Sequence, residues 1–139
     1  MTAITGLPTR PFADSTDSLL RFAMRLDATL TGLAGLFIAA AADPISSATG
    51  LSSGAEFGVG AFFVLYGAVV FVLAAAIDLH RAGIGVIIAN IVFTVAAVVV
   101  VAAGTLPLTD TGIAATLASG CYTALIGYLQ YLGVRRLPA

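Results

Sequence analysis

Long apolar segments alternate with short polar ones along the chain. The apolar segments cover about residues 22–42, 57–77, 84–103 and 113–133. Each is close to the roughly 20 residues with which an α-helix crosses the hydrocarbon core of a bilayer. Runs of β-branched residues such as 98–101 favour strands in water. Within lipid each segment must satisfy its own backbone hydrogen bonds, so the pattern predicts four helices.

The polar segments between these helices are short. They cover residues 43–56, 78–83 and 104–112, and the first and third contain proline. Short connections place consecutive helices antiparallel. The predicted fold is therefore all-α, an up-down-up-down bundle of four transmembrane helices over residues 21–137. A polar tail, residues 1–20, precedes it.

Two features near the beginning of the chain bear on its processing and its first helix. Asp14 or Ser15 is a candidate cap for a short helix that leads into the membrane. Ala40, Ala41 and Ala42 resemble the small-residue site at which signal peptides are cleaved. However, a signal peptide has an apolar part of about 7–15 residues, and this segment is longer and contains a carboxylate. The first segment is therefore predicted to remain as a membrane span.

The distribution of charge predicts the orientation. Hydrophobic residues make up 60% of the chain and charged residues only 9%, against roughly 25% in soluble domains. The basic residues all lie on the tail, the second connection or the C-terminal end: Arg10, Arg21, Arg25, Arg81, Arg135 and Arg136. By the positive-inside rule, both termini of a multi-pass protein of the plasma (inner) membrane are predicted to be cytoplasmic. The net charge of -1 argues against nucleic-acid binding.

Asp27 is the residue of the first segment that apolar packing does not explain. At about 1.5 Å per residue, Asp27 and Asn90 lie roughly 8–9 Å inside the cytoplasmic edge. Gln130 and Tyr131 approach the same depth from the other end of the chain. These four residues are predicted to form a polar layer that binds a ligand head group or a proton, with Arg135 as a further partner of Asp27. In the alternative interpretation, Asp27 reaches water at the interface or orients the first helix.

Small residues predict where the helices touch. Asp27 is followed at spacing four by Thr31 and Gly35, and Gly54 is followed by Gly58. Gly127 belongs to a stripe of small and polar residues on the fourth segment. Such faces let helices approach closely and form hydrogen bonds. Gly35, Gly54, Gly58 and Gly127 are therefore predicted to mediate helix packing.

The chain offers few residues for catalysis or for binding a cofactor. It has a single histidine, His80, and a single cysteine, Cys121, so an intrachain disulfide, a thiolate cluster and bis-histidine haem ligation are excluded. No nucleotide-binding loop, zinc motif or serine nucleophile motif occurs. No catalytic residue, metal or cofactor is predicted.

Three stretches carry a resemblance to a known group. The opening LRFAMRLDATLTGLAGL, the connection with Asp43-Pro44 and the closing GYLQYLGVRRL resemble small uncharacterised four-helix membrane proteins of actinobacteria, which are broadly similar to the DoxX-like group. The resemblance spans residues 19–137. It implies a four-helix bundle in the plasma membrane, and a redox accessory role by analogy with some DoxX-like proteins. Because the chain has a single cysteine, the sequence argues against thiol-pair chemistry by this chain alone.

These observations lead to two functional hypotheses. In the first, the protein is a non-catalytic accessory or scaffold subunit, or a self-associating bundle, whose partners are the lipid bilayer and a membrane protein or a second copy. In the second, it is a small transporter or a lipid- or quinone-binding bundle that uses the layer around Asp27. An intramembrane enzyme is the third and least supported possibility.

Overall fold

A computed structural model describes residues 16–138, and over that range the protein is helical, with no strand. Its five helices are α1 (Ser18–Ala40), α2 (Ala42–Thr49), α3 (Ser53–Leu73), α4 (Leu79–Ala103) and α5 (Asp110–Arg135). All except α2 are long and apolar enough to cross a membrane. The predicted four-helix transmembrane bundle is confirmed, and the architecture is that of a multi-pass membrane protein.

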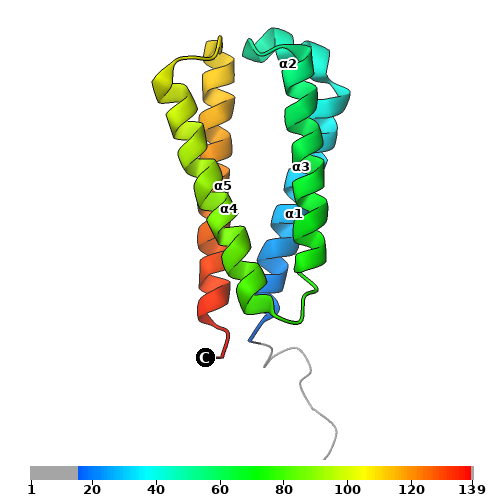
Figure 1. Cartoon of the computed structure of the whole chain (residues 1–139), viewed down its shortest axis with the longest axis vertical. Helices are drawn as coiled ribbons and strands as arrows, with labels where there is room; N and C mark the ends of the chain where they lie inside the picture. The colour runs from blue at the N-terminus through cyan, green and yellow to red at the C-terminus, as the bar shows by residue number, and fades with distance from the viewer. Residues whose placement is uncertain (1–15, 139) are drawn as a thin grey trace, which may run out of the picture.

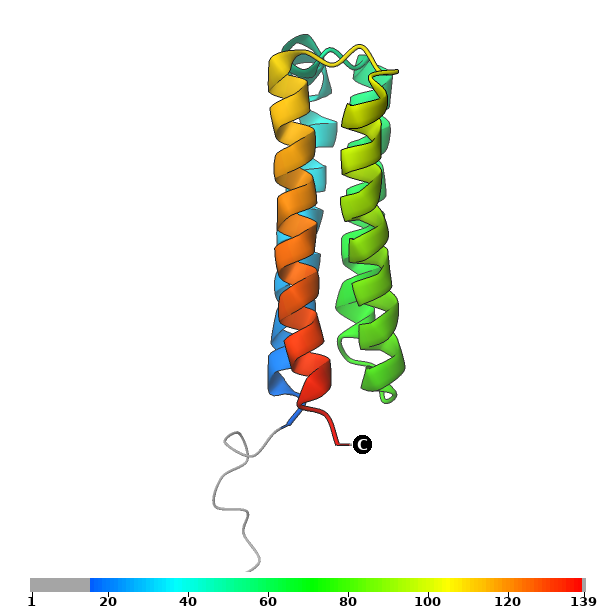
Figure 2. The same ribbon diagram turned by 90° about the vertical axis from the view of Figure 1, so that its left-hand side faces the viewer.

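The four long helices form two pairs. Helix α1 packs along α3, and α4 packs along α5, whereas α3 and α4 have little contact. The pairs lie close together where α1 begins and α5 ends, and further apart toward α2 (Figure 1). Seen from the side, the long helices run nearly parallel to one axis, with α2 and the α4–α5 connection at the same end (Figure 2).

The helices begin earlier than the apolar segments predicted. Polar side chains cap three of them: Ser52 accepts from the backbone N–H of Ala55, Asp78 from that of Arg81, and Thr109 from that of Gly112. Such caps satisfy N–H groups that have no partner inside the helix, so a helix can start several residues before its apolar run.

Both ends of α1 differ in detail from the sequence prediction. Ser18 and Leu20, assigned to the polar tail, belong to α1, and Leu20 is completely buried. The caps proposed at Asp14 and Ser15 lie outside the described residues. At the other end, α1 stops at Ala40 and α2 follows in the predicted loop, because Pro44 falls in the first turn of α2, where a helix tolerates proline.

Helix α2 holds the arginine-free end of the bundle together. The backbone N–H of Thr109 donates to the carbonyl oxygen of Thr49, so the α4–α5 connection is tied to α2. The Thr49 hydroxyl donates to the carboxylate of Glu56, which is 4% exposed in the first turn of α3. Gly50, at φ +89°, ends α2 beside Pro107, in a conformation that favours glycine.

Glycines bring α1 and α3 into close contact, although only one of them was predicted. A Cβ atom on Gly35 would lie 2.6 Å from the carbonyl oxygen of Gly60, and one on Gly67 would lie 2.6 Å from that of Ala28. By contrast, Gly54 and Gly58 have open space around them, so their predicted role in packing within this bundle is wrong. They occupy the face of α3 that points away from α1, because helical periodicity separates them from Gly60 and Gly67.

The predicted packing of Gly127 is confirmed, since a Cβ atom there would lie 3.3 Å from that of Asn90. Beyond the glycines, a core of buried apolar side chains fills the end near the arginines: Leu20, Met24, Ala28, Val70, Ala74, Leu79 and Val86. Arg21 closes this end by donating from Nη1 to the carbonyl oxygen of Ala74, just beyond α3, over 2.7 Å.

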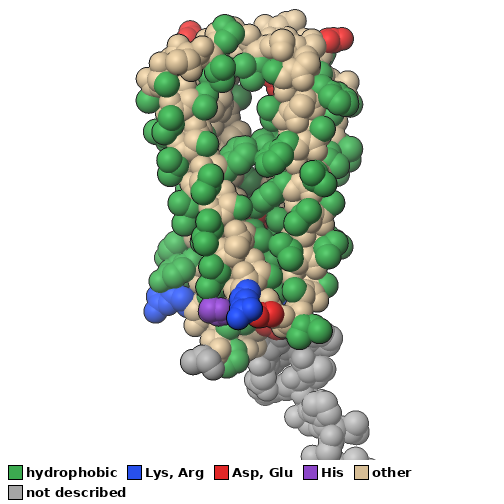
Figure 3. Space-filling model, in the orientation of Figure 1, with side chains coloured by type: hydrophobic (Ala, Val, Ile, Leu, Met, Phe, Trp, Pro, Cys, Tyr) green, Lys and Arg blue, Asp and Glu red, His purple; other side chains and the backbone are tan. Residues whose placement is uncertain are grey.

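Charged side chains separate along the long axis. Basic side chains and the single histidine, His80, lie at the end where α1 begins (Figure 3). Asp78, which caps the start of α4, lies at the same end. Asp43 and Asp110 lie at the opposite end, in the first turns of α2 and α5. The surface between the two ends is predominantly apolar, as lipid contact requires.

Candidate functional site

Asp27 lies at the centre of a hydrogen-bonded cluster inside the bundle. Its side chain is completely buried, and both of its oxygens accept hydrogen bonds. Oδ1 accepts from the hydroxyls of Thr31 and Tyr122, each at 3.1 Å. Oδ2 accepts from the Tyr66 hydroxyl at 3.1 Å and from the side-chain amides of Asn90 and Gln130, each at 3.0 Å. We call these six residues the Asp27 cluster.

Each of the four long helices contributes to the Asp27 cluster. Thr31 follows Asp27 at spacing four on α1, so one helix face presents both side chains. Tyr66 comes from α3 and Asn90 from α4, whereas Tyr122 and Gln130 both come from α5, eight residues apart. The Asn90 amide also donates to Oε1 of Gln130 at 3.0 Å and to the carbonyl oxygen of Val86 at 3.3 Å. The cluster therefore joins the two helix pairs.

The set of donors matches an ionised carboxylate. An ionised Asp only accepts hydrogen bonds, whereas a protonated one must donate. All five partners of Asp27 can donate to it, two as amides and three as hydroxyls, and none of them is charged. The ion pairs in residues 16–138 are Arg21 with Asp17 and Arg81 with Asp78, so no arginine compensates Asp27 there. In an ionised Asp27, these hydrogen bonds alone would offset the cost of desolvation.

A cavity of about 620 Å³ adjoins the cluster on the side that faces away from the arginines. Thr31, Tyr66, Asn90 and Tyr122 belong both to the cluster and to the wall of this cavity. Most of the remaining wall is apolar, and all four long helices supply it: Leu30, Ala34, Ile38, Phe62, Phe63, Ala89, Val92, Phe93, Ala118, Ser119 and Thr123. The cavity thus has a polar floor and mostly apolar walls.

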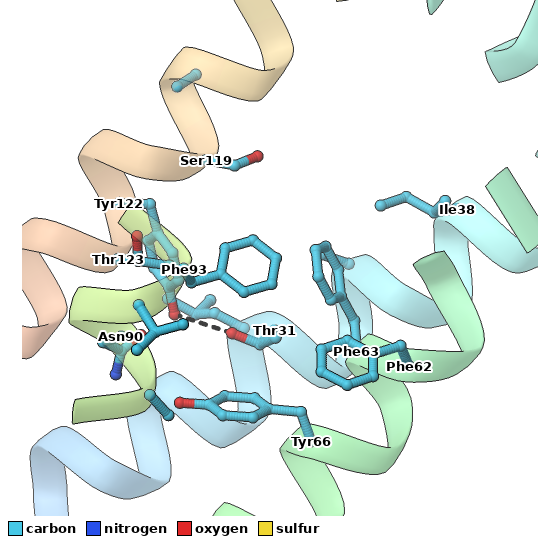
Figure 4. A pocket seen from close by; sticks show the side chains of 15 residues that line it. Thr31, Ile38, Phe62, Phe63, Tyr66, Asn90, Phe93, Ser119, Tyr122 and Thr123 are labelled. Atoms are coloured by element: carbon cyan, nitrogen blue, oxygen red, sulfur yellow. Dashed lines mark hydrogen bonds between the residues drawn. The ribbon is translucent and has the colours of Figure 1, made fainter. Parts of the chain in front are cut away.

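Aromatic rings shape the middle of the cavity. The rings of Phe63 on α3 and Phe93 on α4 lie side by side (Figure 4), with their centroids 5.4 Å apart and their planes tilted by 58°. Tyr66 and Tyr122 extend toward the floor, where the Tyr122 hydroxyl lies 3.4 Å from that of Thr31 (Figure 4). Phe62, beside Phe63, is half exposed on the outer surface. Because α3 and α4 have little other contact, the cavity borders the lipid between the two helix pairs.

The structure brings together three of the four residues predicted to share a polar layer. Asp27, Asn90 and Gln130 are mutually hydrogen-bonded and buried. Placing Tyr131 in this layer was wrong, since it is 46% exposed. Arg135 and Asp27, both among the described residues, form no ion pair, so that predicted pairing was wrong as well. Consecutive side chains of an α-helix are rotated by about 100° about the helix axis. Tyr131 therefore faces outward when Gln130 faces inward. The Arg135 guanidinium lies over the Tyr131 ring, 5.8 Å from its centroid.

Sequence reasoning missed both tyrosines of the Asp27 cluster. A signal was present, because a tyrosine within an apolar span must find a partner for its hydroxyl. Tyr128 and Tyr131 lie near the arginine-rich end, where the interface can satisfy them. Tyr66 and Tyr122 lie well inside their segments, so each should have been assigned to an internal hydrogen bond.

In the described part of the chain, no three His, Cys, Asp or Glu side chains are grouped so that they could hold a metal ion. The polar groups of the site are one carboxylate, two phenols, two amides and the Thr31 hydroxyl, beside a mostly apolar cavity. No protein-family model, curated protein or solved structure matches the chain. The resemblance to DoxX-like proteins stays a prediction from the sequence.

Proposed function

We propose that this protein binds a small amphipathic molecule within the membrane, either to carry it across or to hold it. The observation behind this proposal is that the Asp27 cluster and the cavity share four residues: Thr31, Tyr66, Asn90 and Tyr122. A ligand in the cavity would meet apolar walls along its length and the oxygens of the cluster at one end. This develops the second of the two hypotheses drawn from the sequence.

The size and composition of the cavity support a small-molecule site. Ligand sites in proteins are typically clefts of about 300–1,000 Å³ that combine apolar walls with a few polar groups. The cavity falls within this range. A solely structural hydrogen-bond network would be equally stable with packed side chains beside it. We therefore interpret the adjoining space as room for a ligand.

The position of the cavity supports entry from the bilayer. Phe62 on α3 and Val92 on α4 line the cavity and are also exposed on the outside of the bundle, at 53% and 61%. A ligand dissolved in lipid could pass between these helices without crossing the polar ends of the bundle. In the orientation that we propose, with both termini cytoplasmic in the plasma membrane, the cluster lies nearer the cytoplasm.

Native mass spectrometry of the protein extracted with its lipids tests this proposal. We expect a bound small molecule that is lost in Ala118→Phe, since Ala118 lines the cavity and a ring there would fill it. The matched control is Cys121→Phe, three residues along α5 at an exposed position outside the cavity wall, which should retain the molecule.

Two outcomes would contradict the proposal. One is that both variants retain the same molecule, which would place the molecule elsewhere. The other is a stoichiometric protein partner with no small molecule, which would favour the accessory-subunit hypothesis.

A further inference from the structure

We propose that the ligand of this cavity is a lipophilic cation, an amine or onium ion with apolar substituents. This inference rests on the proposed function, since it names the class of molecule that the cavity would bind. It is derived from three properties of the site: an uncompensated charge, the direction of the hydrogen bonds and the aromatic walls.

The first property is the charge of Asp27. The carboxylate has five neutral donors and no ion-pair partner among residues 16–138. Charges interact more strongly in a protein interior than in water. A cation in the adjoining cavity would therefore be attracted to this site, and an anion would be repelled.

The second property is that the hydroxyl groups around the cavity have already used their protons. Thr31, Tyr66 and Tyr122 donate to Asp27. Ser119 donates to the carbonyl oxygen of Ala115, and Thr123 to that of Gly120. Each hydroxyl has one proton and two acceptor lone pairs, so these five groups can offer only lone pairs to a ligand.

The amide of Asn90 is committed in the same way, since the two protons of Nδ2 are shared among three acceptors, on Asp27, Gln130 and Val86. A ligand that only accepts hydrogen bonds, such as a quinone, would find no free donor on these side chains. An ammonium group brings its own donors and matches the acceptors of the floor. The direction of the hydrogen bonds thus favours a cation over a neutral acceptor.

The third property is the aromatic wall. Phe62, Phe63, Tyr66, Phe93 and Tyr122 all line the cavity. The face of an aromatic ring carries partial negative charge and attracts cations, most strongly where water is excluded. Figure 4 shows the rings of Phe63, Phe93 and Tyr66 around the space above the floor. These rings can also contact the apolar substituents of the ligand.

Equilibrium binding to the protein in phosphatidylcholine nanodiscs tests the inference. The probes are tetraphenylphosphonium and tetraphenylborate, which have similar shape and opposite charge, and decylubiquinone, which is neutral and only accepts hydrogen bonds. We expect saturable binding of the phosphonium, at least about tenfold weaker binding in Asp27→Asn, and no saturable binding of the borate. Ala118→Phe should abolish phosphonium binding, whereas Cys121→Phe should not.

The wild-type comparison of phosphonium with borate needs no variant, so it stands even if Asp27→Asn fails to fold. Equal binding of the two ions would overturn the inference, as would unchanged phosphonium binding by a folded Asp27→Asn protein. If decylubiquinone alone binds, and Ala118→Phe abolishes that binding, the charge inference fails while the proposed function stands. If none of the three probes binds, both the charge inference and the proposed function fail.

Discussion

The side-chain amide of Asn90 lies 3.0 Å from Oδ2 of Asp27, and this hydrogen bond joins α4 to α1. The same nitrogen lies 3.0 Å from Oε1 of Gln130 on α5. One side chain therefore connects both helix pairs at a depth where α1 and α4 have few other contacts. This amide is therefore one of the links that place the two pairs relative to one another, beside the bonds from Gln130 and Tyr122 to Asp27.

We expect Asn90→Leu to destabilise the bundle by about 1–3 kcal/mol, because it removes one donor from the buried carboxylate. A double-mutant cycle with Gln130→Leu should give a coupling energy above about 0.5 kcal/mol, since the two side chains are in contact. Unfolding in detergent micelles measures both values. Additive effects of the two substitutions would show that the amides act independently.

Two substitutions at Asp27 separate its charge from its hydrogen bonds. Asp27→Asn keeps one acceptor oxygen, and the hydroxyls of Thr31 and Tyr122 can rotate to accept from the new amide. We expect a loss of about 1–2 kcal/mol. Asp27→Leu leaves five donors without their acceptor, and those of Asn90 and Gln130 are buried, so we expect a loss of at least about 3 kcal/mol. Thermal unfolding ranks the two, and equal losses would mean that the acceptor oxygens contribute little.

Hydropathy was sufficient to predict the four spans because the membrane restricts the choice of structure. A segment of about 20 apolar residues has few alternatives to a helix in lipid. The limits of the helices were less predictable. Ser52, Asp78 and Thr109 start three helices outside the apolar runs, and α2 forms in a segment whose proline and glycine suggested a loop.

The residues of the candidate site that could be predicted are polar residues at similar depths within their apolar segments. Asp27, Asn90 and Gln130 were found because each is an unusual residue for an apolar span. Tyr66 and Tyr122 were missed because their rings were counted as apolar, although their depth required a hydrogen-bond partner for each hydroxyl. The placement of Tyr131 failed because depth alone does not determine which way a side chain faces.

The choice of glycines failed for a related reason. Spacing four marked Gly54 and Gly58, but the sequence did not reveal which face of α3 meets α1. Gly60 and Gly67 lie on that face, seven residues apart, and both are buried. Spacing can predict that two residues share a face, but only tertiary contacts determine its neighbour.

A matched pair of glycine substitutions tests this packing. Gly60→Ala would place a Cβ atom 2.5 Å from the backbone nitrogen of Ala39, so the helices would have to separate. Gly58→Ala meets open space and gains helix propensity of up to about 1 kcal/mol. We expect Gly60→Ala to lower the melting temperature and Gly58→Ala to leave it unchanged or raise it. The reverse order would mean that α3 is rotated from its position here.

Arg21 should stabilise the junction between α1 and the end of α3. Its guanidinium donates to the carbonyl oxygens of Ala74 and Ala76 and pairs with Asp17 at 2.9 Å. Because the site is partly exposed, we expect Arg21→Ala to cost only about 1 kcal/mol. Arg25→Ala is the control, since Arg25 is exposed one turn further along α1. Comparable losses of stability in the two variants would mean that Arg21 has no specific role at this junction.

The orientation can be tested with single cysteines, because the chain has only one of its own. In a Cys121→Ser background, we place a cysteine at Ser47, in α2, or at His80, in the first turn of α4; both positions are exposed. If both termini are cytoplasmic, a membrane-impermeant maleimide added to intact cells should label Ser47→Cys and leave His80→Cys unlabelled until the membrane is permeabilised. The positive-inside rule gives this expectation, since Arg81 neighbours position 80 and the α2 end has no arginine. Labelling of His80→Cys in intact cells, with Ser47→Cys protected, would reverse the orientation and place the Asp27 cluster nearer the outer surface.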